Sequence, residues 1–337
     1  MNEIVSRLFV VARRVAMKRP FDGYGFCLPG HSMSSDAAQH GGPCLSVECT
    51  VARSARFLLA MALLSMACGS MAMNASWSQA RKPFRIYANT WYVGSEGLSA
   101  ILITSPQGHI LIDGTLTRNA PMIEANIRAL GFHLHDIRVI LNSHAHHDHA
   151  GAIAALARDS GARVVASVEG ARELEAGGND PGDPLYGDVP RYPAVAHVET
   201  VRDGGVVRVG PLAVAVHDTP GHTPGNASFT WRSCEGSRCR AMAYVGSLTA
   251  IGRSGYRFSA HPQVVASFRH SFRTVAALPC DILLTPHPDA IDFMAKVAAR
   301  DRGVRPDPLV DADACKRLAA SAGRAFDAVL AKERAAH

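Results

Sequence analysis

The pattern of apolar and polar positions changes repeatedly between a strand period and a helix period from about residue 84 onward. Short apolar runs bounded by turn residues predict strands at 100–104, 109–112, 139–141, 163–166, 213–217, 229–231, 242–245 and 282–284. Apolar residues recurring every three or four positions predict helices at 122–130, 151–158, 264–278 and 312–330. Ser-Pro-Gln-Gly at 105–108 joins the first two strands, which we therefore expect to form a hairpin. Strands that alternate with helices are typical of an α/β protein.

Three of these strands are followed closely by a histidine. His144 comes after the strand at 139–141, and His222 and His287 follow the strands at 213–217 and 282–284. Open α/β folds place their chemistry on loops at strand ends. The three positions are therefore candidates for one functional site.

The run from His144 to His149 carries the strongest chemical signal. It reads His-Ala-His-His-Asp-His, so five of its six residues can bind a metal ion. Imidazole and carboxylate groups are the usual protein ligands of zinc apart from cysteine. His144 and His146, two residues apart at a strand end, can converge on one ion. Asp148 and His149, on the next turn, can face a second ion beside the first.

His222 and His287 complete the two ligand sets. Both lie in turns stiffened by proline, Thr-Pro-Gly-His-Thr-Pro-Gly at 219–225 and Thr-Pro-His-Pro at 285–288. The predicted sets are His144, His146 and His222 for one ion, and Asp148, His149 and His287 for the other. Three protein ligands leave room for a water molecule, which indicates a catalytic site rather than a closed structural one.

The alternative is that such residues are ordinary surface or capping histidines. We prefer this interpretation for His147, whose side chain should point away from the site of its neighbours. The same applies to the histidines outside these motifs, at positions His109, His133, His135, His197, His217, His261 and His270.

The N-terminal part of the chain has a different pattern. Two arginines, Arg53 and Arg56, precede an apolar run at 57–64, and small residues follow through Ala75. This is the pattern of a secretory signal peptide, so we assign 51–75 to a signal and 76–337 to a single catalytic domain that reaches the periplasm. Residues 1–50 have no place before a signal and suggest a start site assigned too early. A genuine extension without structure is the alternative, and N-terminal sequencing of the native protein distinguishes the two.

Composition narrows the classes of function. Of the 337 residues, 47% are hydrophobic and 19% are charged, which suits a globular protein with a sizeable core. Residues 81–337 hold 28 Lys and Arg against 25 Asp and Glu, and so weak an excess indicates no nucleic-acid partner. No stretch after residue 80 is long and apolar enough to insert stably into a membrane, and we expect a monomer.

Four cysteines in an exported protein predict two disulfides among Cys234, Cys239, Cys280 and Cys315.

Together these motifs resemble the metallo-β-lactamase superfamily, over nearly all of residues 85–337. Leu-Ile-Asp-Gly at 111–114, the run 144–149, Gly-His-Thr-Pro-Gly at 221–225 and Pro-His-Pro at 286–288 occur in the order of that family. The resemblance implies an αββα sandwich, in which two mixed sheets pack together and helices cover their outer faces. It also implies that Asp113 steadies the metal site by orienting its ligands, a role with a sound physical basis.

Ser247 narrows the resemblance further. Glyoxalase-type, lactonase-type and phosphodiesterase members usually carry an aspartate that bridges both metals, after the strand between the last two histidine ligands. That strand here leads into Tyr-Val-Gly-Ser-Leu-Thr at 244–249, without an aspartate. The ligand cysteine of the first β-lactamase subclass is also absent, because Cys239 precedes the strand. With His149 as a ligand, the pattern resembles the B3 subclass of metallo-β-lactamases.

The B3 resemblance also implies how the cysteines pair. Members of the subclass commonly join two cysteines placed like Cys280 and Cys315. Some also close a small loop with a pair spaced like Cys234 and Cys239, for which a zinc knuckle is the alternative.

Residues at the substrate cleft follow from the same resemblance. Ser247 and Thr249 match positions that contact the carboxylate of the substrate, although Thr249 could instead cap the loop that follows it. We expect the walls of the cleft near Trp91 and from the loops 177–193 and 250–260, the second of which carries Tyr256.

The implied function is hydrolysis of the β-lactam ring of penicillins, cephalosporins and carbapenems by a metal-bound hydroxide, which confers antibiotic resistance. Two zinc ions per chain are the implied cofactors, Asp148 orients the nucleophile, and a small-molecule β-lactam is the implied partner. One alternative is another exported hydrolase of this fold, of the lactonase or thioesterase type. A second is a zinc-binding protein without catalytic activity, although a storage site would be expected to close its coordination.

Overall fold

Two β-sheets form the centre of the described part of the protein, which is residues 75–335 of a computed structural model. The first sheet contains, in spatial order, β1 (Phe84–Tyr87), β2 (Thr90–Tyr92), β3 (Ile101–Ile103), β4 (His109–Ile112), β5 (Ile137–Leu141), β6 (Arg163–Ala166) and β7 (Val198–Thr200). The second contains β12 (Ile282–Leu284), β11 (Arg238–Tyr244), β10 (Ala227–Glu235), β9 (Leu212–Asp218) and β8 (Val206–Val209).

Each sheet mixes parallel and antiparallel pairing. In the first, β1 to β4 pair in antiparallel fashion, whereas β4 to β7 are parallel. In the second, β8 to β11 form an antiparallel meander, and β12 joins β11 in parallel. The parallel strands β4 and β5 therefore end at one edge of their sheet, where their loops can meet.

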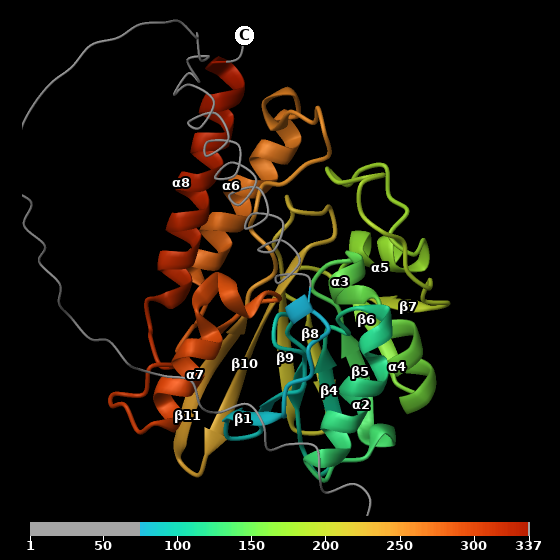
Figure 1. Ribbon diagram of the computed structural model, residues 1–337, viewed down its shortest axis with the longest axis vertical. Coiled ribbons are helices and arrows are strands. Elements are labelled where there is room, and N and C mark those ends of the chain that lie inside the picture. Colours follow the sequence, from blue (N-terminus) through green and yellow to red (C-terminus); the bar gives the residue numbers. More distant parts are fainter. Residues whose placement is uncertain (1–74, 336–337) are drawn as a thin grey trace, which may run out of the picture. The chain divides into compact units, whose positions relative to one another are not determined.

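Helices cover the outer faces of both sheets (Figure 1). The helices are α2 (Ala120–Ala129), α3 (His147–Ala150), α4 (Ile153–Ser160), α5 (Val168–Glu175), α6 (Pro262–Ala277), α7 (Phe293–Asp301) and α8 (Ala314–Ala335), with short 3-10 turns at Thr117–Asn119, Leu134–Asp136, Phe258–Ala260 and Pro288–Ile291. Of these, α7 packs Phe293 and Val297 into the core between the sheets. Apolar side chains of α2, α4 and α5 pack on the first sheet, and those of α6 and α8 pack on the second. The predicted αββα sandwich is therefore confirmed.

Successive residues of the central strands alternate between two apolar cores. In β4, Ile110 and Ile112 face the core between the sheets, whereas Leu111 faces the helices. In β11, Met242 points between the sheets and Ala243 points toward α6 and α8. Because both faces are buried, these strands are continuous apolar runs rather than alternating ones.

The predicted elements agree with this structure, with differences of a few residues at their ends. The hairpin of β3 and β4, the strand Ile282–Leu284 and the long helices α6 and α8 are confirmed. The segment between α5 and β7 contains neither helix nor strand, as predicted for the loop 177–193. The pattern missed β1, β2, β7, β8, α3, α5 and α7, because these elements are short or only half-buried and carry little periodicity.

Both disulfides that the resemblance implies are present. Cys234 is bonded to Cys239 at the end of the β10–β11 hairpin, and Cys280 is bonded to Cys315, which links the segment before β12 to α8. Between residues 75 and 335, no helix is long and apolar enough to cross a membrane. The predicted extension at 1–50 and nearly all of the predicted signal peptide at 51–75 lie outside the described residues.

The two disulfides should differ in their contribution to stability. Cys280–Cys315 closes a loop with a sequence separation of 35, against 5 for Cys234–Cys239. The entropy of loop closure predicts a loss of about 4 kcal/mol for the double variant C280A/C315A and about 2 kcal/mol for C234A/C239A. Urea unfolding of the two variants measures this difference. Equal losses would show that loop length does not govern the effect here.

Candidate metal centre

The run from His144 to His149 crosses from a strand end into a helix. β5 ends at Leu141, an irregular segment with bends at Ser143 and His146 follows, and α3 begins at His147. This change of direction places His144 and His146 on the strand side, and Asp148 and His149 in the first turn of α3. The amide of Gly114, after β4, donates a hydrogen bond of 2.7 Å to the carbonyl of His149 and so ties the helix to the neighbouring strand.

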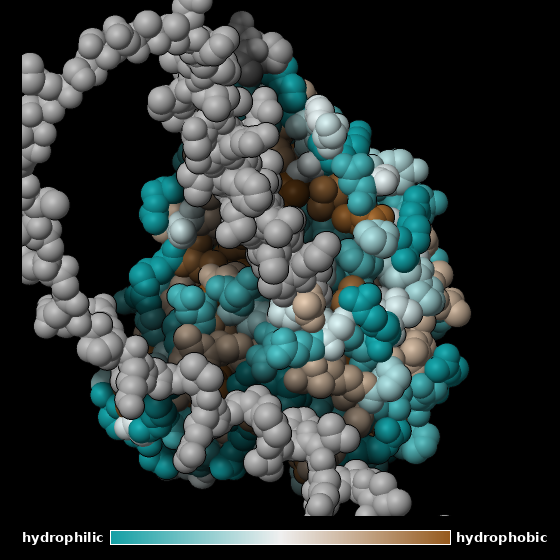
Figure 2. All heavy atoms as spheres, viewed as in Figure 1, coloured by the Kyte–Doolittle hydropathy of each residue, from teal (hydrophilic) through white to brown (hydrophobic). Residues whose placement is uncertain are grey.

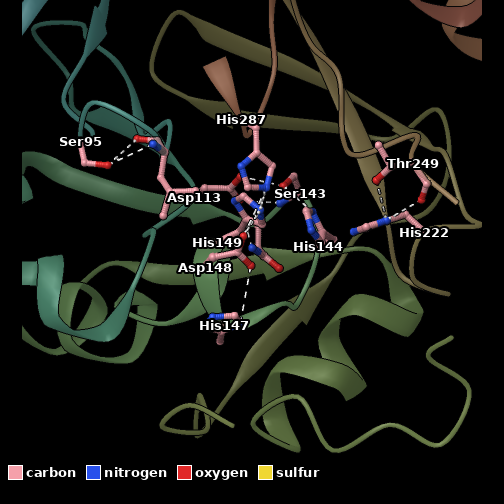
Figure 3. A network of polar contacts seen from close by, with 12 residues as sticks. Ser95, Asp113, Ser143, His144, His147, Asp148, His149, His222, Thr249 and His287 are labelled. Carbon is pink, nitrogen blue, oxygen red and sulfur yellow. Dashed lines mark hydrogen bonds and ion pairs between the residues drawn. The ribbon is translucent and has the colours of Figure 1, made fainter. Parts of the chain in front are cut away.

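The six predicted ligands form two adjacent groups (Figure 3). In each group the potential ligand atoms all lie within 4.8 Å of one another. The first group is His144, His146 and His222, all buried, and the second is Asp148, His149 and His287. The ring centroids of His144 and His149 are 4.3 Å apart, so the two groups lie side by side.

Asp148 holds the second group together. Its Oδ2 lies 3.1 Å from Nε2 of His149 and 3.3 Å from Nε2 of His287, and these two nitrogens are 3.1 Å apart. Burial alone would raise the pKa of the Asp148 carboxyl, but the charges and hydrogen bonds of His149 and His287 hold it well below its usual range. Asp148 is therefore a carboxylate at neutral pH.

The chemistry of these donors fits metal ions. Burial, with the neighbouring histidines, holds the pKa of His144 well below its usual value, and burial and His146 lower the pKa of His222 to about 3. Both rings are therefore neutral, and metals bind neutral imidazole and ionised carboxylate. Within the described residues, Nε2 of His144 is buried and has no hydrogen-bond partner, as expected of an atom whose lone pair is kept for a metal. The arrangement fits a dinuclear metal site.

Asp113 fixes the position of the segment that carries His144. It follows β4 and accepts hydrogen bonds from Asn142 Nδ2 (3.0 Å), the amide and hydroxyl of Ser143 (2.7 and 2.6 Å) and the hydroxyl of Tyr244 (2.7 Å). Ser143 Oγ lies 3.2 Å from Nδ1 of His144. Because the Ser143 hydroxyl donates to Asp113, its oxygen is free to accept from Nδ1, which leaves Nε2 of His144 for the metal.

His222 is positioned by the turn at 219–225 and by the loop after β11. Gly221 has a φ of 138°, and a Cβ there would lie 2.8 Å from the ring of Phe268, so glycine is required beside the ligand. Nδ1 of His222 lies 2.8 Å from the carbonyl oxygen of Thr249 and 3.2 Å from its hydroxyl. Thr249 thus orients His222, a contact that the sequence did not indicate. The predicted contact of Ser247 and Thr249 with substrate stays a prediction.

Hydrogen bonds with Glu173 of helix α5 and with Ser167, directly before it, hold the same turn in place. Oε1 of Glu173 accepts a hydrogen bond of 2.8 Å from the amide of Gly225, and Ser167 Oγ donates one of 2.7 Å to the Gly225 carbonyl. Burial raises the pKa of Glu173 to about 8, and the charges of Asp180 and Asp183 add to the shift. Glu173 was not among the predicted site residues, because its helix shows no recognisable motif.

Two loops meet beside the centre. In the loop 177–193, Oδ2 of Asp183 lies 2.9 Å from Nε2 of His146. The Pro184 carbonyl accepts a hydrogen bond of 2.9 Å from the amide of Arg253, in the loop 250–260. Figure 2 shows apolar residues that reach a mostly hydrophilic surface in the upper half of the face drawn. Ile251, in the loop 250–260, is 53% exposed. The two loops therefore touch each other, and their predicted role as walls of the cleft stays a prediction.

The aromatic residue beside the centre is Trp77, not Trp91. The Trp77 ring lies 5.5 Å from the ring of His287 and 6.3 Å from that of His147. Trp91 instead packs edge-on against Phe132 and lies under Arg85. Trp91 itself lies on β2 and packs, partly buried, against the core beneath the helices. A cleft wall formed by residues near Trp91 stays a prediction. Nothing in the sequence around Trp77 distinguished it.

The remaining histidines lie outside the centre. Nδ1 of His147 is 3.8 Å from Oδ1 of Asp148, and its ring centroid is 6.3 Å from that of Trp77, but His147 belongs to neither group of potential ligands. In the part of the chain that is described, the two groups above are the sets of three that could hold a metal ion. Neither set contains any of the other seven histidines.

The comparison with protein families agrees with this geometry. The model of the Metallo-beta-lactamase superfamily matches residues 95–287, which include all six ligands. The chain belongs to this superfamily. Among solved structures it is similar to the Rm3 metallo-beta-lactamase, with 47% identity, a TM-score of 0.75 and coverage of 77% of this chain and 97% of that one. It is also similar to MEM-A1, a subclass B3 metallo-beta-lactamase isolated from a soil metagenome library, with 46% identity, a TM-score of 0.74 and coverage of 77% and 100%.

Curated relatives of this metallo-hydrolase carry a different activity. The chain is 31% identical to a hydroxyacylglutathione hydrolase of Fuscovulum blasticum over 173 residues, which are 51% of this chain and 55% of the relative. It therefore spans about half the length of that relative. The superfamily and its hydrolytic chemistry are common to both comparisons, whereas the substrate differs.

Glu173 should make the stability of the metal-free protein depend on pH. Its folded-state pKa of about 8 lies above the ordinary value of 4.5. The contribution of protonated Glu173 to the free energy of unfolding is therefore fully present below about pH 4.5 and is lost as the pH rises to about 8. Glu173→Gln keeps a neutral side chain at every pH. We expect this variant to gain stability over the wild type across that range, by up to a few kcal/mol, since one pKa unit is worth about 1.4 kcal/mol.

Urea unfolding of both chelator-treated proteins at several pH values checks this expectation. Glu169→Gln, on the exposed side of the same helix, is the matched control and should follow the wild type. A stability difference for Glu173→Gln that does not change with pH would contradict the assignment.

Proposed function

We propose that this protein is a zinc-dependent β-lactamase of the B3 type, which opens the β-lactam ring of antibiotics. The observation that carries the proposal is a dinuclear site with one carboxylate among its six ligands, and with Ser247 where relatives with other substrates usually place a bridging aspartate. The likeness to several solved B3 enzymes, at 38 to 47% identity, supports it. Zinc is inferred from the ligand types, five imidazoles and one carboxylate.

The chain's own residues have defined tasks in this reaction. When bound, two zinc ions would supply an activated water molecule and polarise the substrate carbonyl. The first group of histidines and the second group, which contains Asp148, would hold these ions. Asp148, ionised and at the centre of its group, would accept a hydrogen bond from the attacking water and orient it.

Other residues would place the substrate. The hydroxyls of Ser247 and Thr249 can donate hydrogen bonds to its carboxylate. Thr249 is exposed and Ser247 is half-buried, so solvent reaches both residues. Trp77, against His287, offers an apolar surface next to the second group. The loops 177–193 and 250–260 would border the bound antibiotic.

A thioesterase of the hydroxyacylglutathione hydrolase type is the second candidate. The curated relatives favour it, because several share 31 to 36% identity with parts of this chain. The absence of an aspartate at position 247 argues against it, since a ligand shared by both metals would be lost. An exported metallo-hydrolase of the lactonase type is disfavoured for the same reason.

We also propose that the protein is exported to the periplasm and acts there as a monomer. The signal pattern at 51–75 supports export. Two disulfides agree with an oxidising compartment. The N-terminal sequence of protein recovered from a periplasmic fraction, and its mass in solution, test these two statements.

Hydrolysis assays separate the candidate functions. We expect the purified full chain to hydrolyse a chromogenic cephalosporin and a carbapenem, to lose this activity with a chelator, and to regain it with added zinc. An acylated glutathione thioester, offered under the same conditions, should be a poor substrate. Turnover of the thioester with no turnover of any β-lactam, in protein that binds two zinc ions, would reject the proposal in favour of the thioesterase.

Variants of two histidines test the ligand assignment. His222→Ala removes one of three ligands from the first group, so we expect loss of one metal equivalent and a fall in kcat/KM of at least about 100-fold. His147→Ala is the control, since its ring lies outside both groups, and activity should change by less than about threefold. Metal analysis after gel filtration and steady-state kinetics provide the measurements. Equal losses in the two variants would refute the assignment.

A further inference from the structure

The three histidines of the first group are not held in the same way. Nδ1 of His144 faces Ser143 Oγ at 3.2 Å, and Nδ1 of His222 faces the Thr249 carbonyl at 2.8 Å. In His146 it is Nε2 that has a partner, the carboxylate of Asp183 at 2.9 Å. This third contact comes from the loop 177–193, which lies some 37 residues further along the chain.

The acceptor determines which nitrogen of His146 is free. A carboxylate can only accept, so Nε2 of a neutral ring carries the proton and donates it to Asp183. The lone pair of His146 is then on Nδ1. By the same reasoning His144 and His222 present Nε2. His144 and His146 leave the chain two residues apart, and presenting opposite nitrogens lets both reach one point from neighbouring positions.

Asp183 is itself held in place. It is 5% exposed, and its Oδ1 accepts a hydrogen bond of 2.8 Å from the amide of Leu185. Its amide donates to the Asp180 carbonyl, and its carbonyl accepts from the amide of Tyr186. The carboxylate is thus fixed by the turn around it, with Oδ2 left for His146.

The charge of Asp183 also suits this position. Asp148 belongs to the second group, so the first group consists of three imidazoles and contains no carboxylate. A divalent ion bound there would have no anionic ligand from that group. A carboxylate hydrogen-bonded to the far side of a ligand imidazole makes that ligand more basic and partly balances the charge of the ion.

We propose that Asp183 is a positioning residue of the first metal site, which sets the tautomer and ring orientation of His146 and thereby the affinity of that site for a divalent ion. The inference rests on the proposed two-metal function and deepens it. It assigns the loop 177–193 a second task, since one loop borders the cleft and also supports a ligand. Metal affinity at the first site is therefore linked to the position of this loop.

Metal binding by the full chain tests the proposal without a substrate. Asp183→Asn removes the charge and keeps the size of the side chain, and Asp188→Asn is the matched control, an exposed carboxylate in the same loop that accepts a hydrogen bond from Ser254. Zinc titrations against a chromophoric chelator should give two sites in the wild type and the control. In Asp183→Asn we expect one site to weaken about 10- to 100-fold, while the other is unchanged.

Two further measurements separate positioning from a general structural role. The imidazole ¹⁵N shifts of the metal-free protein should report an Nε2-protonated His146 in the wild type and a mixture of tautomers in Asp183→Asn. Urea unfolding of the metal-free variant should match the control, Asp188→Asn. Asp183→Glu, which keeps the charge, should recover part of the affinity if its carboxylate reaches Nε2.

The outcomes decide the matter. A weakened single site with the altered tautomer supports the proposal. Two sites of wild-type affinity in Asp183→Asn, or an equal loss in Asp188→Asn, would overturn it. So would a loss of affinity that is matched by a loss of stability in the metal-free protein. If the wild type binds two zinc ions and hydrolyses no β-lactam, the proposed function fails, and the titrations still decide the role of Asp183.

Discussion

A buried carboxylate at Asp113 holds the two sheets and the metal centre in register. It lies at the end of β4 in the first sheet and accepts a hydrogen bond from Tyr244, at the end of β11 in the second. The amide and hydroxyl of Ser143, directly before the first ligand, complete the contacts together with Asn142. Burial raises the pKa of Asp113, and these hydrogen bonds oppose the shift. A buried carboxylate left without such partners would be strongly destabilising, so the strands and the ligand loop must meet in one arrangement.

Around this anchor, each histidine of the first group depends on a different part of the fold. Ser143 belongs to the ligand loop, Thr249 to the loop after β11, and Asp183 to the loop after α5. The site is therefore complete when all three segments have folded against one another. Burial lowers the pKa of His144 and of His222 and so keeps these two rings neutral, which is the state that a metal requires. The same packing that stabilises the sandwich thus prepares the donor atoms.

The sequence predicted the parts of this site that depend on local spacing. The run 144–149 and the proline-bound turns around His222 and His287 identify ligands because the donor residues are close together in the chain or follow an apolar strand. Asp183 and Trp77 could not be found in this way. Each reaches the centre through the folding of a long loop or a terminal segment, and neither has a spacing relationship to the ligands.

The number of carboxylates among the ligands sets the net charge of the site, and this charge bears on the proposed substrate. With Asp148 as the one acidic ligand, two divalent ions would leave a formal charge of about +3 before water binds. An aspartate at position 247 would lower that charge by one and would occupy the space between the ions. A β-lactam antibiotic brings its own carboxylate and develops negative charge on the amide nitrogen as the ring opens. A strongly positive centre would stabilise both, because electrostatic stabilisation is largest where charge forms in the transition state. Ser247 in place of a bridging acid would therefore change the electrostatics of the site in the direction that the proposed substrate, a β-lactam, needs.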